Sequence, residues 1–148
     1  MGKPPPNTRT DELRAELRSH GLRATTARLA ILRALRLAQG PVSHGEMQGL
    51  LDEHGWDRTT LYRNLVELAK AGLAVRNDLG DHTWRFEAVR ETGDLSAFSH
   101  PHFVCGSCGT IACLDGVTLK VERPGPLAKA LRERDVQIQV RGTCDSCV

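Results

Sequence analysis

Aromatic residues are scarce in this chain of 148 residues, where they make up 4% of the sequence. This scarcity disfavours a sheet that binds single strands by stacking bases on aromatic rings. Long hydrophobic runs are also missing, and none approaches the roughly 18 residues that a membrane helix needs. The segment from Met1 to Thr10 has three prolines and no apolar core, unlike a signal peptide. We therefore expect a cytoplasmic protein with no membrane partner.

The sequence has no large excess of positive or negative charge. It contains 20 Lys and Arg and 18 Asp and Glu, which leave a net charge of +2. This balance disfavours a histone-like tail. Acidic residues are nevertheless absent from Leu17 to Gly45, and all five cysteines follow residue 100. The uneven distribution predicts two domains, residues 10–89 and residues 90–148. In a reducing cytoplasm, clustered cysteines usually bind metal.

Hydrophobic spacing and capping residues predict four helices in the first domain. A hairpin of two strands follows them, and this order is typical of a winged helix, which reads DNA. Fewer elements are expected in the second domain, so the predicted fold class is α+β. The expected helices are Asp11–His20, Thr25 or Thr26 to Gly40, Ser43–His54, Asp57–Gly72 and, in the second domain, Pro126–Arg134. The expected strands are Leu73–Asn77, Thr83–Ala88, His102–Cys105, Thr110–Leu114 and Val136–Arg141.

The start of the fourth helix has the composition of a DNA-reading surface. Its apolar stripe would leave a polar set facing outward, namely Thr59, Thr60, Tyr62 and Arg63. The N-terminal end of a recognition helix enters the major groove, where Arg can bind guanine with two hydrogen bonds. Arg23 and Arg28, in the acid-free stretch, are candidates for phosphate or minor-groove contacts. The alternative is an ordinary solvated helix face.

Four cysteines form two C-x-x-C pairs, Cys105 with Cys108 and Cys144 with Cys147. A gap of two residues lets both sulfurs of one turn face one ion, and two such turns make the tetrahedral thiolate cage that zinc favours. We predict a structural Zn²⁺ that joins the two ends of the second domain. A reversible disulfide switch, or thiols with no common role, are the alternatives.

A second group of potential ligands precedes the first cysteine pair. On a strand, His100 and His102 would face the same side, and Glu87 can add a carboxylate. Mixed nitrogen and oxygen ligands suit Fe²⁺, Mn²⁺, Ni²⁺ or Zn²⁺ and bind less permanently than four thiolates. The alternative for the histidines is plain surface exposure. Cys113 is left over from the cage and is either a small core residue or a soft ligand of this second site.

These motifs, in this order, resemble the ferric uptake regulator (Fur) family of bacterial metal-responsive repressors. The likeness spans Leu13 to Cys147. It is carried by Gly21-Leu22-Arg23, Thr59-Thr60-Leu61-Tyr62-Arg63, Arg85-Phe86-Glu87, His100-Pro101-His102-Phe103-Val104-Cys105-Gly106-Ser107-Cys108-Gly109 and the closing Cys144-x-x-Cys147. The resemblance implies an N-terminal winged helix and a small C-terminal α/β dimerisation domain.

The same resemblance implies roles for single residues. Tyr62 and Arg63 match the pair that contacts bases and phosphates, and Arg23 matches a minor-groove contact. Three ligands of the family's sensory site, which bridges the two domains, correspond to Glu87, His100 and His102. Cys113 stands where relatives usually carry an acidic sensory ligand. His44 lies three residues after Pro41, the place of a histidine ligand in many iron sensors, and is a candidate substitute.

The sequence thus predicts a homodimeric, metal-dependent transcriptional repressor of iron or zinc homeostasis that binds a palindromic operator in double-stranded DNA. The regulatory ion would be Fe²⁺, Zn²⁺ or Mn²⁺. A peroxide- or redox-sensing regulator is the alternative within the family, although its peroxide-sensing branch typically has Asp in place of Glu87. A zinc enzyme such as a deaminase is disfavoured, because four cysteines would close the ion and no H-x-E motif lies near them. A thiol redox switch is the remaining alternative, and we do not expect an enzyme.

Overall fold

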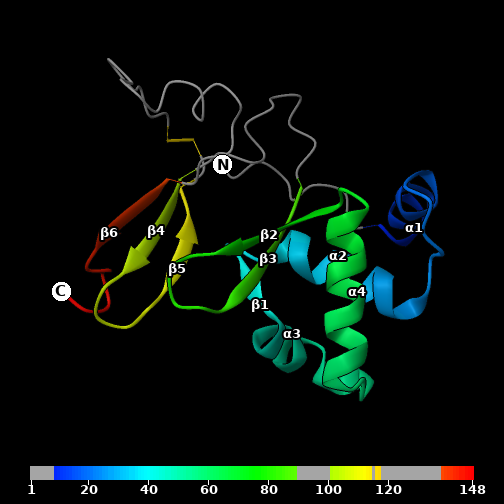
Figure 1. Ribbon diagram of the computed structural model, residues 1–148, viewed down its shortest axis with the longest axis horizontal. Coiled ribbons are helices and arrows are strands. Elements are labelled where there is room, and N and C mark those ends of the chain that lie inside the picture. Colours follow the sequence, from blue (N-terminus) through cyan, green and yellow to red (C-terminus); the bar gives the residue numbers. More distant parts are fainter. Residues whose placement is uncertain (1–8, 90–100, 115, 118–137) are drawn as a thin grey trace. The chain divides into compact units, whose positions relative to one another are not determined.

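The computed structural model describes residues 9–89, 101–114, 116–117 and 138–148 (Figure 1). The chain divides into two compact units, Met1–Glu91 and Thr92–Val148, which are taken in turn. Within the described residues, no helix is both long enough and apolar enough to cross a membrane.

Helices make up most of the first unit, and polar caps fix where three of them begin. The Thr25 side chain accepts a hydrogen bond from the Arg28 N–H, and Asp57 accepts one from the Thr60 N–H. Ser43 and Glu46 form the predicted capping box, in which each side chain bonds the other residue's backbone N–H. The four predicted helices of this unit are confirmed as α1 (Thr10–Ser19), α2 (Thr26–Leu37), α3 (His44–Leu50) and α4 (Arg58–Lys70).

The third helix is shorter than predicted. It ends at Leu50, and a 3₁₀ turn, η1 (Asp52–His54), follows it. Gly55 then adopts a left-handed backbone conformation with φ +66°. This conformation is open to glycine at little cost, so the chain can reverse there and begin α4 three residues later, at Arg58.

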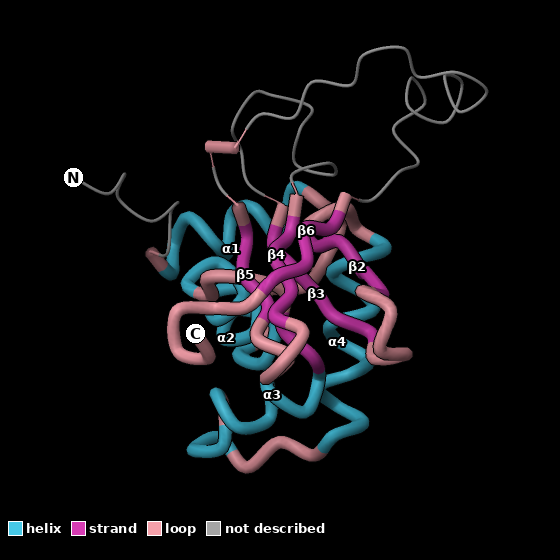
Figure 2. The backbone as a smooth tube through the Cα atoms, turned by 90° about the vertical axis from the view of Figure 1, so that its left-hand side faces the viewer, coloured by secondary structure: helices cyan, strands magenta, loops and turns pink. Residues whose placement is uncertain are grey.

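The wing is a three-stranded antiparallel sheet in the order β1-β3-β2, built from β1 (Val42–Ser43), β2 (Ala74–Asp78) and β3 (Trp84–Ala88). The predicted hairpin is confirmed, and its long strands β2 and β3 can be followed in Figure 2. The expectation of only two strands was wrong, because Val42 pairs with Phe86 and Ser43 with Arg85. Two residues are too few to give a periodic hydrophobic signal, so this strand could not be read from the sequence.

One apolar core holds the first unit together. The predicted stripe of α4 is confirmed, since Leu61, Leu65 and Leu68 are all buried. α4 packs against α2, α3 and β2 (Figure 1). The other buried members of the core are Leu13, Leu17, Ile31, Leu32, Leu35, Val42, Met47, Leu51, Leu73, Ala74, Phe86 and Ala88.

A three-stranded sheet forms the described part of the second unit. Its order is β5-β4-β6, with β4 (His102–Cys105), β5 (Ile111–Cys113) and β6 (Gln139–Gly142). β4 pairs antiparallel with β5 and parallel with β6. All three predicted strands are confirmed, while the predicted helix at Pro126–Arg134 lies outside the described residues. With the helical first unit, these strands confirm the α+β class.

Candidate metal centres and nucleic-acid interface

Two tight turns carry the four paired cysteines. The first turn begins where β4 ends, at Cys105, and closes with a 3.0 Å hydrogen bond from the Gly109 N–H to the Cys105 carbonyl. The second follows β6 and closes with a 2.8 Å bond from the Cys147 N–H to the Cys144 carbonyl. A 2.9 Å bond from the Gly106 N–H to the Gly142 carbonyl holds the turns side by side. The parallel pairing of β4 and β6 therefore brings cysteines 39 residues apart into one cluster.

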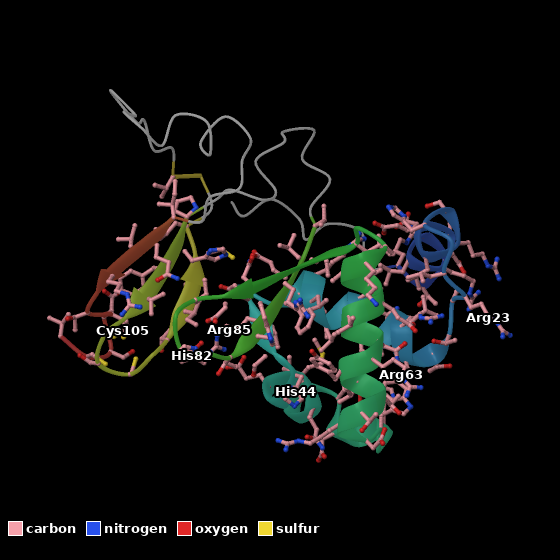
Figure 3. All side chains as sticks on the ribbon, in the orientation of Figure 1. Arg23, His44, Arg63, His82, Arg85 and Cys105 are labelled. Carbon is pink, nitrogen blue, oxygen red and sulfur yellow. The ribbon has the colours of Figure 1, made fainter. Side chains whose placement is uncertain are left out.

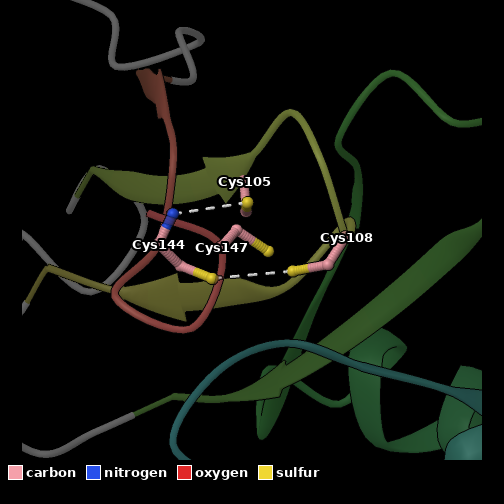
Figure 4. A group of neighbouring side chains, drawn as sticks. All are labelled: Cys105, Cys108, Cys144 and Cys147. Atoms are coloured by element: carbon pink, nitrogen blue, oxygen red, sulfur yellow. Dashed lines mark hydrogen bonds between the residues drawn. The ribbon is translucent and has the colours of Figure 1, made fainter.

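The cysteine cluster fits a tetrahedral metal ion. The sulfur atoms of Cys105, Cys108, Cys144 and Cys147 all lie within 4.8 Å of one another, and all four are free thiols. The Cys108 and Cys144 sulfurs are 3.6 Å apart (Figure 4). A tetrahedral zinc site with Zn–S bonds of about 2.3 Å has sulfur atoms about 3.8 Å apart. The four sulfurs thus need only small movements to bind one ion.

Hydrogen bonds to sulfur prepare part of this cluster to act as thiolate. Backbone N–H groups of Cys108, Cys144 and Ser107 lower the pKa of Cys105 to about 6. The Thr110 hydroxyl, 3.0 Å from the Cys108 sulfur, is the main cause of the lowered pKa of Cys108. Contact with Cys108 and Cys144 raises the pKa of Cys147 to about 12. Without a cation, four thiolates at this distance repel one another, so a dication would relieve this repulsion.

A histidine and a cysteine face each other on the neighbouring strands of the same sheet. His102 of β4 pairs directly with Cys113 of β5, and their ligand atoms lie within 4.8 Å of one another. Cys113 is half-buried. Of the other predicted ligands of the second site, His100 lies outside the described residues and Glu87 lies on β3 of the first unit. Within the second unit, the structure therefore brings together two potential ligands of that site.

The first two turns of α4 present polar side chains to solvent. Thr59, Tyr62 and Arg63 are exposed and Thr60 is half-buried, while the leucine stripe faces the core. Figure 3 shows Arg63 on α4 and Arg23 beside the connection between α1 and α2, and Arg23 is also exposed. The helix N-terminus adds a favourable field for phosphate at this end.

Arg28 has a structural partner that the sequence did not reveal. Its guanidinium forms an ion pair with Glu67 of α4 and donates a 3.0 Å hydrogen bond to the Arg23 carbonyl. Only 16% of the Arg28 side chain is exposed. Its charge thus joins α2 to α4. The predicted contact of Arg28 with phosphate stays a prediction. Glu67 lies 39 residues away in sequence, beyond the reach of any local pattern.

His44, the suggested substitute ligand, packs against the exposed tyrosine of α4. The His44 and Tyr62 rings meet edge to face with centroids 5.8 Å apart. Tyr62 also meets Phe86 edge to face at 6.3 Å. Aromatic pairs with this geometry are attractive, so the two neighbours hold the Tyr62 ring in one orientation. No local sequence pattern signals this contact, because the three residues lie on α3, α4 and β3.

Known proteins resemble this chain over most of its length. The sequence model of the Ferric uptake regulator family matches residues 19–138. The peroxide-responsive repressor PerR of Staphylococcus aureus is 29% identical over 143 residues, which cover 93% of this chain and 90% of PerR. The ferric uptake regulator of Vibrio cholerae has a TM-score of 0.66 at 23% identity, covering 88% of this chain and 98% of that one. That of Pseudomonas aeruginosa with manganese has a TM-score of 0.59 at 29% identity, covering 89% and 98%.

Proposed function

The chain belongs to the ferric uptake regulator family of transcription regulators, which are not enzymes, and from this premise we propose that it is a homodimeric, metal-dependent repressor of metal homeostasis genes. The observation that carries the proposal is the exposed polar face of α4, set on a winged helix and combined in one chain with a four-cysteine cluster. The first feature suits duplex DNA and the second suits a metal ion.

DNA is read by the N-terminal half of α4 in this proposal. Arg63 is exposed and donates to a guanine edge or a phosphate, and Tyr62 contacts a thymine methyl or a phosphate. Thr59 and Thr60 lie at the helix start, where backbone N–H groups favour phosphate. Arg23 adds a minor-groove or phosphate contact. A palindromic operator follows from the dimer, since two α4 helices would meet two half-sites.

The four-cysteine cluster holds a structural Zn²⁺ in this proposal. Four thiolates close the tetrahedral coordination shell and leave no open position for a substrate. The ion joins the turn after β4 to the turn after β6, which lie side by side at the same end of the described sheet because the two strands are parallel. Its role is to stabilise the second unit, and it does not exchange during sensing.

Glu87, His100 and His102 bind the regulatory ion, which is Fe²⁺, Zn²⁺ or Mn²⁺. Glu87 belongs to β3 of the wing and His102 to β4 of the second unit, so an ion that binds both couples the DNA-reading unit to the dimerising unit. A ligand that binds one arrangement better shifts the population toward it. Changing a mostly open protein to a mostly closed one takes roughly 5 kcal/mol of differential binding, which a few metal bonds supply.

The experiment is a fluorescence-anisotropy titration of the purified protein against a candidate inverted repeat. It is done with the zinc-loaded chain alone and with added Fe²⁺, Mn²⁺ or Zn²⁺. We expect sequence-specific binding only when the regulatory site is filled. Equal affinity for all sequences, independent of added metal, would contradict the proposal.

The variant His102→Ala tests whether the regulatory site and the four-cysteine site are independent. We expect the variant to keep one zinc per chain and the wild-type circular dichroism spectrum, while its operator affinity no longer rises with added metal. Loss of an imidazole that binds the ion directly should weaken ion binding by at least the roughly 10- to 100-fold that loss of an outer-shell partner costs. If the variant instead unfolds or loses its zinc, the histidine is structural and the division into two sites is wrong.

A peroxide sensor is the second candidate, and the 29% identity with the peroxide-responsive repressor PerR favours it. Glu87, where that branch typically has Asp, weighs against it. Operator binding of the Fe²⁺-loaded and Zn²⁺-loaded proteins should be compared before and after exposure to hydrogen peroxide. A loss confined to the Fe²⁺-loaded protein would favour the peroxide sensor over the metal sensor.

A further inference from the structure

Cys113 and His102 occupy one cross-strand position on the face of the second sheet. They are direct partners in the antiparallel β4–β5 pair. Side chains at directly opposite positions of such a pair project to the same face. The Cys113 sulfur and a ring nitrogen of His102 lie within 4.8 Å of each other. In a tetrahedral zinc site, a nitrogen and a sulfur ligand are about 3.6 Å apart, so a small adjustment lets both bind one ion.

Strand parity separates this pair from the four-cysteine cluster. Cys105 follows His102 by three positions on β4, and successive side chains of a strand alternate between faces. Cys105 therefore projects to the opposite face from His102 and Cys113. The sulfur atoms that lie within 4.8 Å of one another in the cluster are those of Cys105, Cys108, Cys144 and Cys147. Cys113 is thus not a spare ligand for the same ion.

Among the described residues, Cys113 does not belong to the buried apolar core. Cys113 is half-buried, and the buried apolar cluster of the described residues lies in the first unit. Its strand neighbours Ile111 and Ala112 are half-buried as well. A thiol in this position remains close enough to solvent for an ion to reach it.

We propose that Cys113 and His102 together form the sulfur–nitrogen half of the regulatory site and make that site selective for a thiophilic ion such as Zn²⁺ or Co²⁺ over Mn²⁺. The inference rests on the proposed function, because it names the ligand chemistry of the same regulatory ion. Thiolate ligands favour borderline and soft ions, whereas carboxylates suit Mn²⁺. A chain with a carboxylate in place of Cys113 would lack this preference.

The test uses Co²⁺ as the probe on the full-length protein, purified with one zinc per chain. Co²⁺ bound to thiolate gives a ligand-to-metal charge-transfer absorption in the near ultraviolet, which nitrogen and oxygen ligands do not give. We expect this band to grow with the added equivalent of Co²⁺ while the original zinc stays bound. Zinc is followed in the same titration with a chromophoric chelator, so that cobalt entering the four-cysteine cluster is recognised.

Cys113→Ser should abolish the band, and Ala112→Ser is the matched control. Ala112 pairs with Phe103, so its side chain lies on the other face of the same strand. Both variants add a hydroxyl to β5, but only the first removes the proposed ligand. We expect the affinity for Zn²⁺ at the regulatory site to fall about tenfold or more in Cys113→Ser and to remain unchanged in Ala112→Ser.

Cys113→Asp keeps a ligand at this position and changes its class. We expect the ratio of Zn²⁺ to Mn²⁺ affinity to fall about tenfold or more, because a carboxylate accepts Mn²⁺ more readily than a thiolate does. An unchanged ratio would overturn the claim that Cys113 sets selectivity.

The outcomes distinguish the inference from the function on which it rests. If a second Co²⁺ binds to the wild type without a charge-transfer band, the sulfur ligand is wrong and the metal sensor stands. If no second Co²⁺ binds at all, both are overturned. Survival of the band in Cys113→Ser, with zinc still in the four-cysteine cluster, would also overturn the inference.

Discussion

The described parts of the two units differ in the contacts that hold them together. The first has a core of 15 buried apolar residues, drawn from all four α-helices and from β1, β2 and β3. Among the described residues of the second, Cys105 is the one buried side chain of the hydrophobic type. What the described part of the second unit has instead is a cluster of four thiols in the turns that follow β4 and β6.

This difference follows from size. A small unit buries too little apolar surface to offset the entropy of ordering its chain, and metal ions commonly supply the missing stability. A unit of about 90 residues can rely on packing alone. Under the proposed function, this contrast would make the DNA-reading unit independent of the structural ion, so that metal in the cysteine cluster would govern folding and metal at the second site would govern regulation.

Removal of the structural zinc should have the largest effect and should separate the two units. Apparent binding free energies at structural zinc sites are roughly 10 kcal/mol or more, and most of this is folding free energy of the surrounding chain. We expect a strong chelator to unfold the second unit and leave the helices of the first intact. Amide hydrogen exchange, resolved along the chain, measures this directly.

Cys144→Ser should have the same effect as the chelator, because it removes one of the four thiols that would bind zinc. Cys113→Ser is its matched control. Both remove one thiol, but only the first removes a member of the cluster. Zinc retained at one per chain in Cys144→Ser, or α4 amides that exchange together with those of β4, would contradict the separation.

Leu65→Ala should destabilise the first unit and leave the second intact, which is the opposite of the effect of zinc removal. Leu65 is fully buried on α4, and truncating a buried leucine typically costs about 2–5 kcal/mol through lost burial and the cavity that remains. We expect the first unit to unfold at lower denaturant concentration while zinc stays bound to the second. Val140→Ala, at an exposed position of β6, is the control of small effect. Loss of zinc from Leu65→Ala at native pH would show that the units depend on each other.

Arg63→Ala should reduce operator binding without affecting the apolar core of the first unit or the cysteine cluster of the second. One arginine contact to a guanine is worth about 1–3 kcal/mol, or about 5- to 150-fold in affinity. Lys70→Ala removes the same charge from the other end of α4 and is the matched control. Anisotropy titration at fixed salt should show a loss for Arg63→Ala alone. Equal losses would indicate that α4 contributes only a general positive field.

The sequence was sufficient wherever the signal is local. Capping residues at Thr25, Ser43 and Asp57 located three helix starts, and the leucine stripe of α4 gave its buried face. The cysteine spacing likewise pointed to one cluster, because two residues between ligands form a tight turn. β1 was missed because a strand of two residues has no period to detect.

Long-range pairings were beyond local patterns. Glu67 meets Arg28 across the α2–α4 interface, and His44 meets Tyr62 across the α3–α4 interface. Both depend on how helices pack, which no sequence spacing encodes. They matter for the candidate DNA interface, because the ion pair with Glu67 occupies the guanidinium of Arg28, a predicted DNA contact. The position of Cys113 opposite His102 was also beyond local patterns, because it depends on the register of the β4–β5 pair.

Thr110→Val should have the smallest effect and act on the cysteine cluster alone. The Thr110 hydroxyl is the main cause of the lowered pKa of Cys108, whose ordinary value is 9.0. The hydroxyl therefore stabilises the Cys108 thiolate fully at a pH above 9.0. This stabilisation is lost as the pH falls through the lowered pKa of Cys108. Without the hydroxyl, protons compete better with zinc, and we expect the pH midpoint of zinc release to rise by less than about one pH unit. Ser107→Ala is the control, because its backbone N–H, which lowers the pKa of Cys105, remains. A lower pH midpoint of zinc release in Thr110→Val would show that the hydroxyl does not stabilise the bound thiolate. In that case the backbone N–H donors alone would explain why the thiols of the cluster ionise readily.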